Sequence, residues 1–182
     1  MRELSLHILD LVENSLEAGA TQVEIEIRED LKQDLFCFRV RDNGRGMDED
    51  TLQHAADAFY TKRCTRKFGF GLPLLKAACE RCEGKLVLES KPWQGTIVTT
   101  TFRYSHWDRA PLGDIATTIF LVLAGRPDVK LYYRHWVDGK SFEFSSEEVK
   151  RRLGPVPLNH VAVLDWLKGY LAENIGHLYG GA

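Results

Sequence analysis

The sequence predicts an α/β sandwich in which an open sheet of about four strands carries helices on one face. Residues 22–30 and 34–42 alternate apolar and polar side chains, which is the pattern of half-buried strands. Residues 2–18 and 72–84 instead place their apolar side chains at helical spacing. Together these patterns give the first two strands and the helices that pack on them.

The remaining elements of this first part follow from local signals. Acidic residues open the segment 48–60 and suit the positive N-terminus of a helix. The segment 61–71 is basic and contains glycines, so we expect a loop there. Residues 85–91 and 95–104 read as two strands joined by a turn, which completes the four-stranded sheet.

The pattern changes after residue 105, and we expect two units: a first domain over 1–104 and a small C-terminal α/β annex over 105–182. The elements predicted for the annex are a helix at 112–125, a hairpin turning at Asp138-Gly139, and helices at 145–154 and 159–175. Its role is not indicated by any motif.

Composition excludes several classes of function. The chain has 182 residues and a formal net charge of −2, so nothing favours nucleic-acid binding. No apolar run reaches the roughly 18–20 residues that span a bilayer. Asp10 and Glu13 interrupt any signal-peptide core at the N-terminus, so we expect a cytoplasmic protein without membrane contact. Its four cysteines are then expected to be reduced.

The first helix carries a polar stripe beside its apolar face. His7, Asp10 and Asn14 lie within about 60° of arc when successive residues turn by about 100°. An Asn oxygen can bind Mg²⁺, and an Asp carboxylate can take a proton from water. A solvated helix side is the alternative, and this segment alone favours it.

The segment "RDNGRGM" (41–47) follows a predicted strand. A carboxylate at the end of a strand, here Asp42, can accept a hydrogen bond from an exocyclic amine such as that of adenine. Gly44 and Gly46 would let a flat ring approach the backbone closely. A tight turn capped by Asp42 explains the same residues equally well.

The segment "RKFGFGLPLLK" (66–76) leads into a predicted helix. Gly69 and Gly71 leave backbone N–H groups free to bind phosphate at the helix N-terminus, and Lys62 and Lys67 could neutralise it. A solvated basic loop is the alternative. The sequence lacks the G-K-[ST] of a P-loop, the third glycine of a dinucleotide fingerprint and the ligand pattern of an EF-hand.

The order of these segments resembles the GHKL nucleotide-binding superfamily, which includes gyrase, heat-shock ATPase chaperones, histidine kinases and mismatch-repair MutL. "LDLVENSLEAGATQVEIEI" is similar to the first motif of MutL-type ATPases and "DNGRGM" to the second. "AFYTK" and "GFGLPLLKAACERCEGKLVLES" are similar to histidine kinases and anti-sigma-factor serine kinases. The resemblance covers residues 4 to about 102 and implies a Bergerat-type ATP-binding fold with a mixed or antiparallel sheet.

The resemblance also implies roles for individual residues. Asn14 would coordinate Mg²⁺, Asp42 would bind the adenine amine, and Thr96 would contact adenine through water. The residues expected to bind ATP are Asn14, Ala18, Asp42, Gly44, Gly46, Met47, Phe59, Lys62, Lys67, Gly69, Phe70, Gly71, Leu72 and Thr96. The catalytic base of the family, usually Glu, falls on Asp10, which is one methylene shorter.

Two functions are the main candidates at this point, and a nucleotide-free scaffold is a third alternative. The first is a stand-alone Mg-ATP-dependent ATPase or protein Ser/Thr kinase that acts in regulation. The second is an ATP-sensing module with little turnover, which the shorter base favours. Either form would use a protein partner near the loop 61–71 or the annex, and a homodimer is the commonest assembly for a soluble protein. Cys79 and Cys82 are read as core cysteines rather than a metal or redox pair, and His7 as a structural residue.

Overall fold

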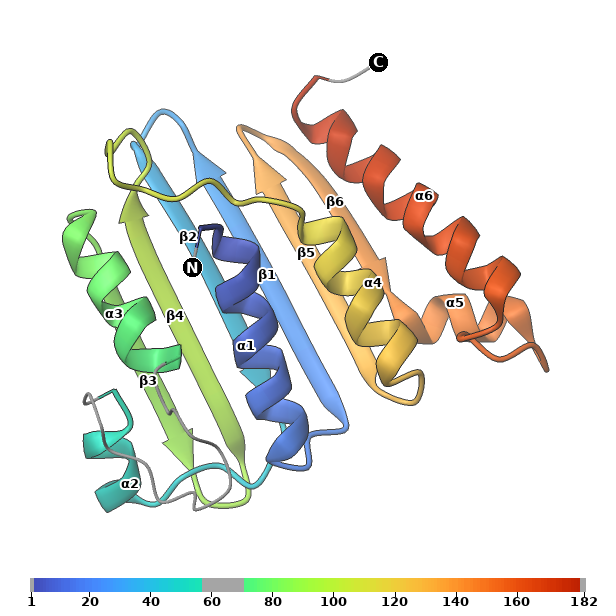
Figure 1. Cartoon of the computed structure of the whole chain (residues 1–182), viewed down its shortest axis with the longest axis horizontal. Coiled ribbons are helices and arrows are strands. Elements are labelled where there is room, and N and C mark those ends of the chain that lie inside the picture. The colour runs from blue at the N-terminus through green and yellow to red at the C-terminus, as the bar shows by residue number, and fades with distance from the viewer. Residues whose placement is uncertain (1, 57–70, 181–182) are drawn as a thin grey trace.

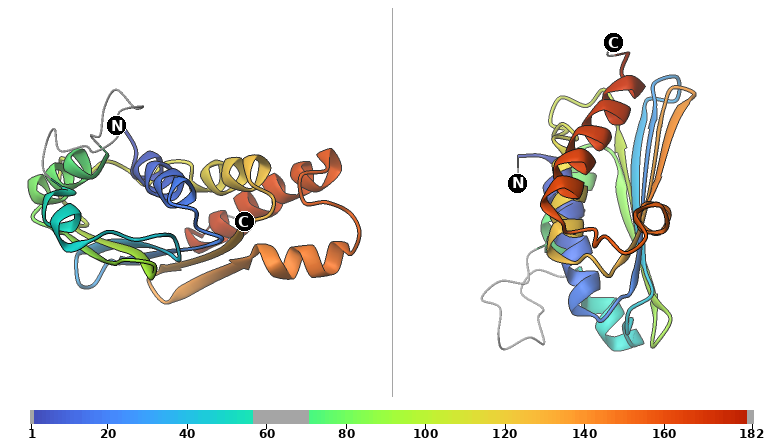
Figure 2. Two further views of the ribbon diagram at one scale, coloured as in Figure 1. Left: turned by 90° about the horizontal axis from the view of Figure 1, so that it is seen from below. Right: turned by 90° about the vertical axis from the view of Figure 1, so that its right-hand side faces the viewer.

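The computed structural model describes residues 2–56 and 71–180. Within them the chain forms one mixed sheet, with α1, α3, α4 and α6 lying on the same side of it (Figures 1 and 2). The helices are α1 Leu4–Glu17, α2 Glu49–His54, α3 Gly71–Arg81, α4 Ile115–Gly125, α5 Ser146–Leu153 and α6 Val161–Leu178. The strands are β1 Gln22–Asp30, β2 Leu35–Asp42, β3 Lys85–Lys91, β4 Gly95–Arg103, β5 Lys130–Val137 and β6 Lys140–Ser145. The predicted α/β sandwich is confirmed.

The strand order in the sheet is β3-β4-β2-β1-β5-β6. Neighbouring strands are antiparallel except β1 and β5, which run parallel with Val23 opposite Leu131 and Ile25 opposite Tyr133. The C-terminal strands therefore extend the sheet of the first part, and residues 105–182 share its hydrogen-bond ladder. The four strands expected from the sequence are one part of a larger sheet.

Alternation along each strand separates a core face from a solvent face. In β1, Val23, Ile25 and Ile27 are fully buried under the helices. Glu26 lies on the opposite face, where its carboxylate contacts Arg39 of β2 at 3.6 Å and Arg134 of β5 at 3.5 Å. These exposed ion pairs contribute little stability, about 0–1 kcal/mol each, so the helix-covered face holds the sheet together.

Aromatic side chains fill the core between the sheet and α1. The rings of Phe36, Phe38 and Phe102 lie 5.9–6.5 Å apart, in edge-on and stacked arrangements. The apolar face of α1 packs against this core, and Leu4 and Ile8 on that face are almost completely buried. The helix is thus fixed against the sheet along its length.

The predicted Asp-Gly hairpin is confirmed in the C-terminal part, and side-chain caps begin two of its helices. Asp138 and Gly139 have φ angles of 45° and 93° and connect β5 to β6, as an Asp-Gly hairpin turn requires. The Asp114 carboxylate accepts a hydrogen bond from the Thr117 N–H at the start of α4, at 2.9 Å. The Ser145 hydroxyl caps α5 in the same way.

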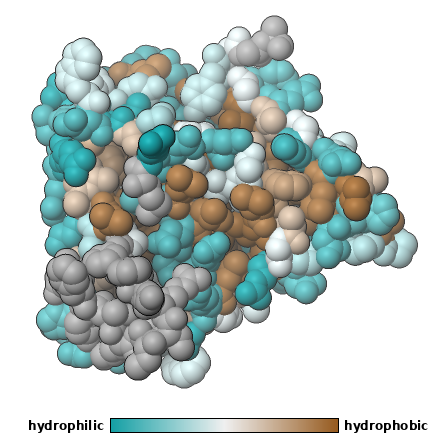
Figure 3. Space-filling view, in the orientation of Figure 1, coloured by the Kyte–Doolittle hydropathy of each residue, from teal (hydrophilic) through white to brown (hydrophobic). Residues whose placement is uncertain are grey.

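The helix-covered side of the molecule carries apolar side chains on its surface over α1 and α4 (Figure 3). A groove of about 400 Å³ lies there, with Leu9 and Leu16 of α1 facing Leu121 and Val122 of α4. In the part of the chain that the structure describes, no helix combines the length and apolar character needed to cross a bilayer.

Several sequence expectations are refined by the structure. The helix expected at 48–60 ends at His54 within the described residues, and residues 57–60 lie outside them. The last helix begins at Val161 and continues to Leu178. Cys79 and Cys82 are free and buried, and burial raises the pKa of the Cys79 thiol to about 12, as suits a core cysteine.

Candidate functional site

Asp42 lies at the end of β2 and is only 8% exposed. Its carboxylate accepts hydrogen bonds from the Ser15 hydroxyl at 2.7 Å, the Gly44 N–H at 2.8 Å and the Thr96 N–H at 3.3 Å. These donors come from α1, the loop after β2 and the start of β4. The carboxylate is therefore held in one orientation at the point where three segments meet.

The glycines around Asp42 allow close backbone contacts. Gly46 has a φ of +64°, and a side-chain carbon there would lie 2.0 Å from the Lys91 carbonyl oxygen. Gly95 has a φ of +89°, and a side-chain carbon there would lie 1.9 Å from the Asp42 carbonyl oxygen. Neither position accepts another residue without moving the backbone, so the loop after β2 is packed directly on the β3–β4 turn.

Ser90 joins this loop to β4. Its hydroxyl accepts a hydrogen bond from the Met47 N–H at 2.9 Å and donates one to the Gly95 carbonyl at 2.9 Å. The Thr96 hydroxyl lies 3.0 Å from the Ser90 hydroxyl oxygen. The structure thereby brings Asp42, Gly46, Met47 and Thr96 close together.

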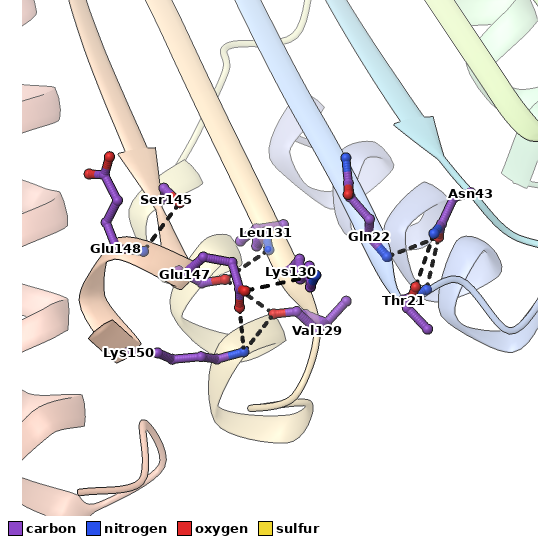
Figure 4. A network of polar contacts seen from close by, with 11 residues as sticks. Thr21, Gln22, Asn43, Val129, Lys130, Leu131, Ser145, Glu147, Glu148 and Lys150 are labelled. Atoms are coloured by element: carbon purple, nitrogen blue, oxygen red, sulfur yellow. Dashed lines mark hydrogen bonds and ion pairs between the residues drawn. The ribbon is translucent and has the colours of Figure 1, made fainter. Parts of the chain in front are cut away.

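Asn43 ties the loop to the start of β1 (Figure 4). Its side-chain oxygen accepts hydrogen bonds from the Thr21 and Gln22 N–H groups, both at 2.9 Å, and its amide nitrogen donates to the Thr21 hydroxyl. The Thr21 carbonyl in turn accepts from the Lys130 N–H at 2.9 Å. A short chain of hydrogen bonds therefore links the Asp42 loop to β5.

Helix α1 presents its polar stripe to the same region. Ala18 contacts this loop, since its carbonyl accepts from the Arg45 N–H at 3.0 Å. Asp10 lies two turns before Ala18 in α1. Its carboxylate lies against Gly71, since a side-chain carbon added at Gly71 would be 1.8 Å from Asp10 Oδ2. Asn14 stands between Asp10 and Ala18 at i, i+4 spacing, so the three residues share one face.

Gly71 is the first residue of α3, and Leu72 is half-buried against the core. The glycine leaves room for the Asp10 carboxylate beside the helix N-terminus. Five of the predicted ATP-binding residues lie outside the described residues: Phe59, Lys62, Lys67, Gly69 and Phe70.

Residues 2–106 match the family model described as "Histidine kinase-, DNA gyrase B-, and HSP90-like ATPase". The chain belongs to this family. Membership implies ATP binding, and the matched range contains both Asp42 and the α1 stripe.

Relatives come from two branches of the GHKL superfamily. The chain is 29% identical over 98 residues to the sensor histidine kinase YvrG of Bacillus subtilis. This aligned segment covers 52% of this chain and 17% of that protein. It is 45% identical over 58 residues to the DNA mismatch repair protein MutL of Cellvibrio japonicus. That segment covers 29% of this chain and 9% of MutL. The chain therefore spans less than a fifth of the length of these relatives.

A solved structure has a similar fold over the whole chain, beyond the residues 2–106 that match the family model. A crystal structure of the N-terminal domain of a DNA repair protein superposes with a TM-score of 0.57 at 18% identity, covering 100% of this chain and 58% of that one. Its coverage includes residues 105–182, so the complete sheet has a counterpart of similar fold.

The sequence did not indicate two residues that support this site. Ser15 lies on the buried face of α1, yet its hydroxyl is the closest donor to Asp42. Ser90 lies within β3 and contacts Met47 and Thr96. A buried position occupied by Ser in an otherwise apolar stripe was the available signal for Ser15; Ser90 had none.

His7 belongs to the polar stripe of α1 but is buried, with 5% of its surface exposed. Among the described residues its Nδ1 has no hydrogen-bond partner. Burial disfavours the charged ring and lowers the pKa of His7 from 6.5 to about 4. The imidazole is therefore neutral at pH 7 and packs as part of the helix–sheet interface.

Replacing Gly95 by Ala is expected to destabilise the GHKL domain by about 2–4 kcal/mol, through the positive φ and the collision with the Asp42 carbonyl. Chemical denaturation measures the loss. Gly169→Ala is the matched control, because nothing lies within 4 Å of that helical position, and Ala should stabilise it by about 0.5–1 kcal/mol. Equal midpoints for Gly95→Ala and wild type would contradict the described packing.

Stability should fall as pH decreases from 6.5 to about 4, because the unfolded chain binds a proton at His7 that the folded chain excludes. The folded-state pKa is the lower one, so this contribution is complete above pH 6.5. The loss attributable to His7 is about 3 kcal/mol. Denaturation of wild type and His7→Leu at pH 7 and 4.5 measures it; parallel losses in both proteins would refute the assignment.

Proposed function

We propose that this chain binds Mg-ATP and transfers or hydrolyses its terminal phosphoryl group as a regulatory ATPase or protein Ser/Thr kinase. Family membership supplies the ATP-binding part of this proposal. The enzymatic part rests on one observation: the Asp10 carboxylate lies directly beside Gly71, the first residue of α3. Because a helix N-terminus favours phosphate, Asp10 would be a base beside a bound phosphate group.

Asp42 would select the base. A carboxylate accepts about four hydrogen bonds in all, and three described donors leave capacity for the adenine amine. Gly46 and Met47 would line the ring, and the Thr96 hydroxyl would contact it through water. Their contacts with Ser90 and β4 would hold this wall in place before the nucleotide arrives.

Asn14 would hold Mg²⁺ together with the phosphates. The donor set fits such an ion, because Asn14 offers a neutral oxygen and Asp10 a carboxylate one turn away, and both are partly exposed. Lys62, Lys67 and Gly69 would complete the phosphate contacts from residues outside the described part of the chain. The metal would neutralise charge on the phosphates, while Asp10 takes a proton from the attacking water or hydroxyl.

ATP sensing with little turnover is the second candidate function. Two sets of hydrogen bonds favour it. Asn43 bonds Thr21 (Figure 4), and the Lys130 N–H donates to the Thr21 carbonyl, so together they connect the Asp42 loop to β5. Lys130 also contacts Glu147 of α5 at 3.9 Å. Nucleotide occupancy could bias residues 105–182 along this route and change the affinity for a partner.

The same proposal includes the cellular location, the partner and the assembly of the protein. We expect a cytoplasmic protein whose partner is another protein, docked near residues 61–71 or on residues 105–182, with a homodimer as the simplest assembly. The formal net charge of −2 gives no electrostatic support for nucleic acid as the partner. Pull-downs with and without ATP identify the partner.

Asp42→Asn should reduce ATP affinity at least tenfold, because the amide presents a donor where the adenine amine needs an acceptor. Isothermal titration calorimetry with Mg-ATP measures the change. Asp138→Asn is a matched control, since it removes the same charge from the β5–β6 turn, and its affinity should equal that of wild type. Unchanged affinity in Asp42→Asn would remove Asp42 from the site.

Asp10→Asn should lower phosphate release about 10²–10⁴-fold while ATP affinity stays within threefold of wild type. Asp10→Glu restores the missing methylene and should be at least as active as wild type. A steady-state phosphate assay with purified protein measures all three.

The same assay separates the two functions. Equal, readily measurable turnover in wild type and Asp10→Asn would contradict Asp10 as the base. ATP binding with no turnover in any of the three proteins would favour sensing over catalysis.

A further inference from the structure

A cavity of about 300 Å³ lies at the opposite end of the sheet from Asp42. It is formed by the end of β1, the segment 104–113, the start of α4 and the end of α6, and its lining includes Glu29, Tyr104, Arg109, Leu112, Ile115 and Ile175. Val23 pairs with Asp42, and Glu29 stands six residues further along β1. At about 3.3 Å per residue the two sites are roughly 20 Å apart.

One wall of this cavity carries a buried carboxylate. Glu29 is 4% exposed, and its Oε1 accepts hydrogen bonds from the Tyr179 hydroxyl and from His135 Nε2, the latter at 3.1 Å. Because a carboxylate only accepts, Nε2 carries the imidazole proton and Nδ1 accepts from the Tyr133 hydroxyl at 2.8 Å. Burial opposes ionisation of Glu29, yet the hydrogen bonds from His135 and Tyr179 prevail and lower its pKa.

A fixed positive charge lines the same cavity. Arg109 Nε donates to the Tyr104 carbonyl at 2.7 Å, and its guanidinium carbon lies 4.5 Å from the centre of the Tyr104 ring and 5.1 Å from that of Phe36. These contacts hold the guanidinium in one place. Glu29 and Arg109 together make the lining electrically neutral, which suits neither a purely anionic nor a purely cationic ligand.

The rest of the lining is apolar. Pro111 and Leu112 come from the connecting segment, Ile115 opens α4, and Ile175 belongs to α6. A concave site with apolar walls and a few oriented polar groups is the usual form of a small-molecule site. Two opposite charges and an apolar wall together define the chemistry of the ligand.

We propose that this cavity binds a small zwitterion with an apolar side chain, of the α-amino-acid class. The ammonium group would contact Glu29, the carboxylate would pair with Arg109, and the side chain would occupy the apolar wall. The hydrogen bonds from Tyr179 and His135 end on Oε1, and the Tyr104 hydroxyl also interacts with this carboxylate. Because a carboxylate accepts about four hydrogen bonds, capacity remains for an ammonium group. Binding would join β1, α4 and α6, and it is independent of the proposed ATP chemistry.

Calorimetric titration of the full chain with three probes tests the ligand class. L-leucine carries both charges, 4-methylpentanoate lacks the ammonium group, and 3-methylbutylamine lacks the carboxylate. The proposal expects L-leucine to bind at least tenfold more tightly than either truncated probe. No binding of L-leucine, or equal binding of the three probes, would overturn it.

Variants test the location. Arg109→Gln should weaken L-leucine binding at least tenfold, and Leu112→Trp should abolish it by filling the cavity; thermal unfolding confirms that each variant is folded. Arg103→Gln is the matched control, because this exposed arginine pairs with Asp34 and Glu83 outside the cavity. Asp42→Asn should bind L-leucine as wild type does. Unchanged binding in Arg109→Gln and Leu112→Trp would refute the site.

Discussion

The Asp42 carboxylate is the interaction on which the rest of the site depends. It joins α1 through Ser15, its own loop through Gly44 and β4 through Thr96. A buried charge is costly unless hydrogen bonds satisfy it, so the three segments are favoured in this one arrangement. The carboxylate that would bind adenine therefore also links α1 to β2 and β4.

Helix α1 runs from the Asp42 loop to the start of α3. Its 3.6-residue repeat places Asp10, Asn14 and Ala18 on one face while its apolar face is buried in the core. Ala18 meets the Asp42 loop, and Asp10 meets the first residue of α3. Strand β1 has the Asp42 loop at one end and Glu29 at the other, which gives the fold two chemically distinct ends.

Local sequence patterns predicted most elements, because alternation, helical spacing and the Asp-Gly turn depend on neighbouring residues. Local patterns could not predict long-range strand pairing. The parallel pairing of β5 with β1 joins strands that are far apart in the chain, so no pattern of neighbouring residues indicates it. The Asp42 loop was predicted through its motif, whereas Ser15 and Ser90 act through contacts 27 and 43 residues away. Glu29 and His135 are separated by 106 residues. The roles of Lys62, Lys67 and Gly69 stay predictions, because they lie outside the described residues.

The most direct measurement is a crystal structure of the full chain with Mg²⁺ and a non-hydrolysable ATP analogue. We expect the adenine amine within hydrogen-bond distance of the Asp42 carboxylate, the metal on the Asn14 oxygen and the terminal phosphate facing Asp10. A nucleotide bound elsewhere, or an adenine ring with no contact to Asp42, would contradict it.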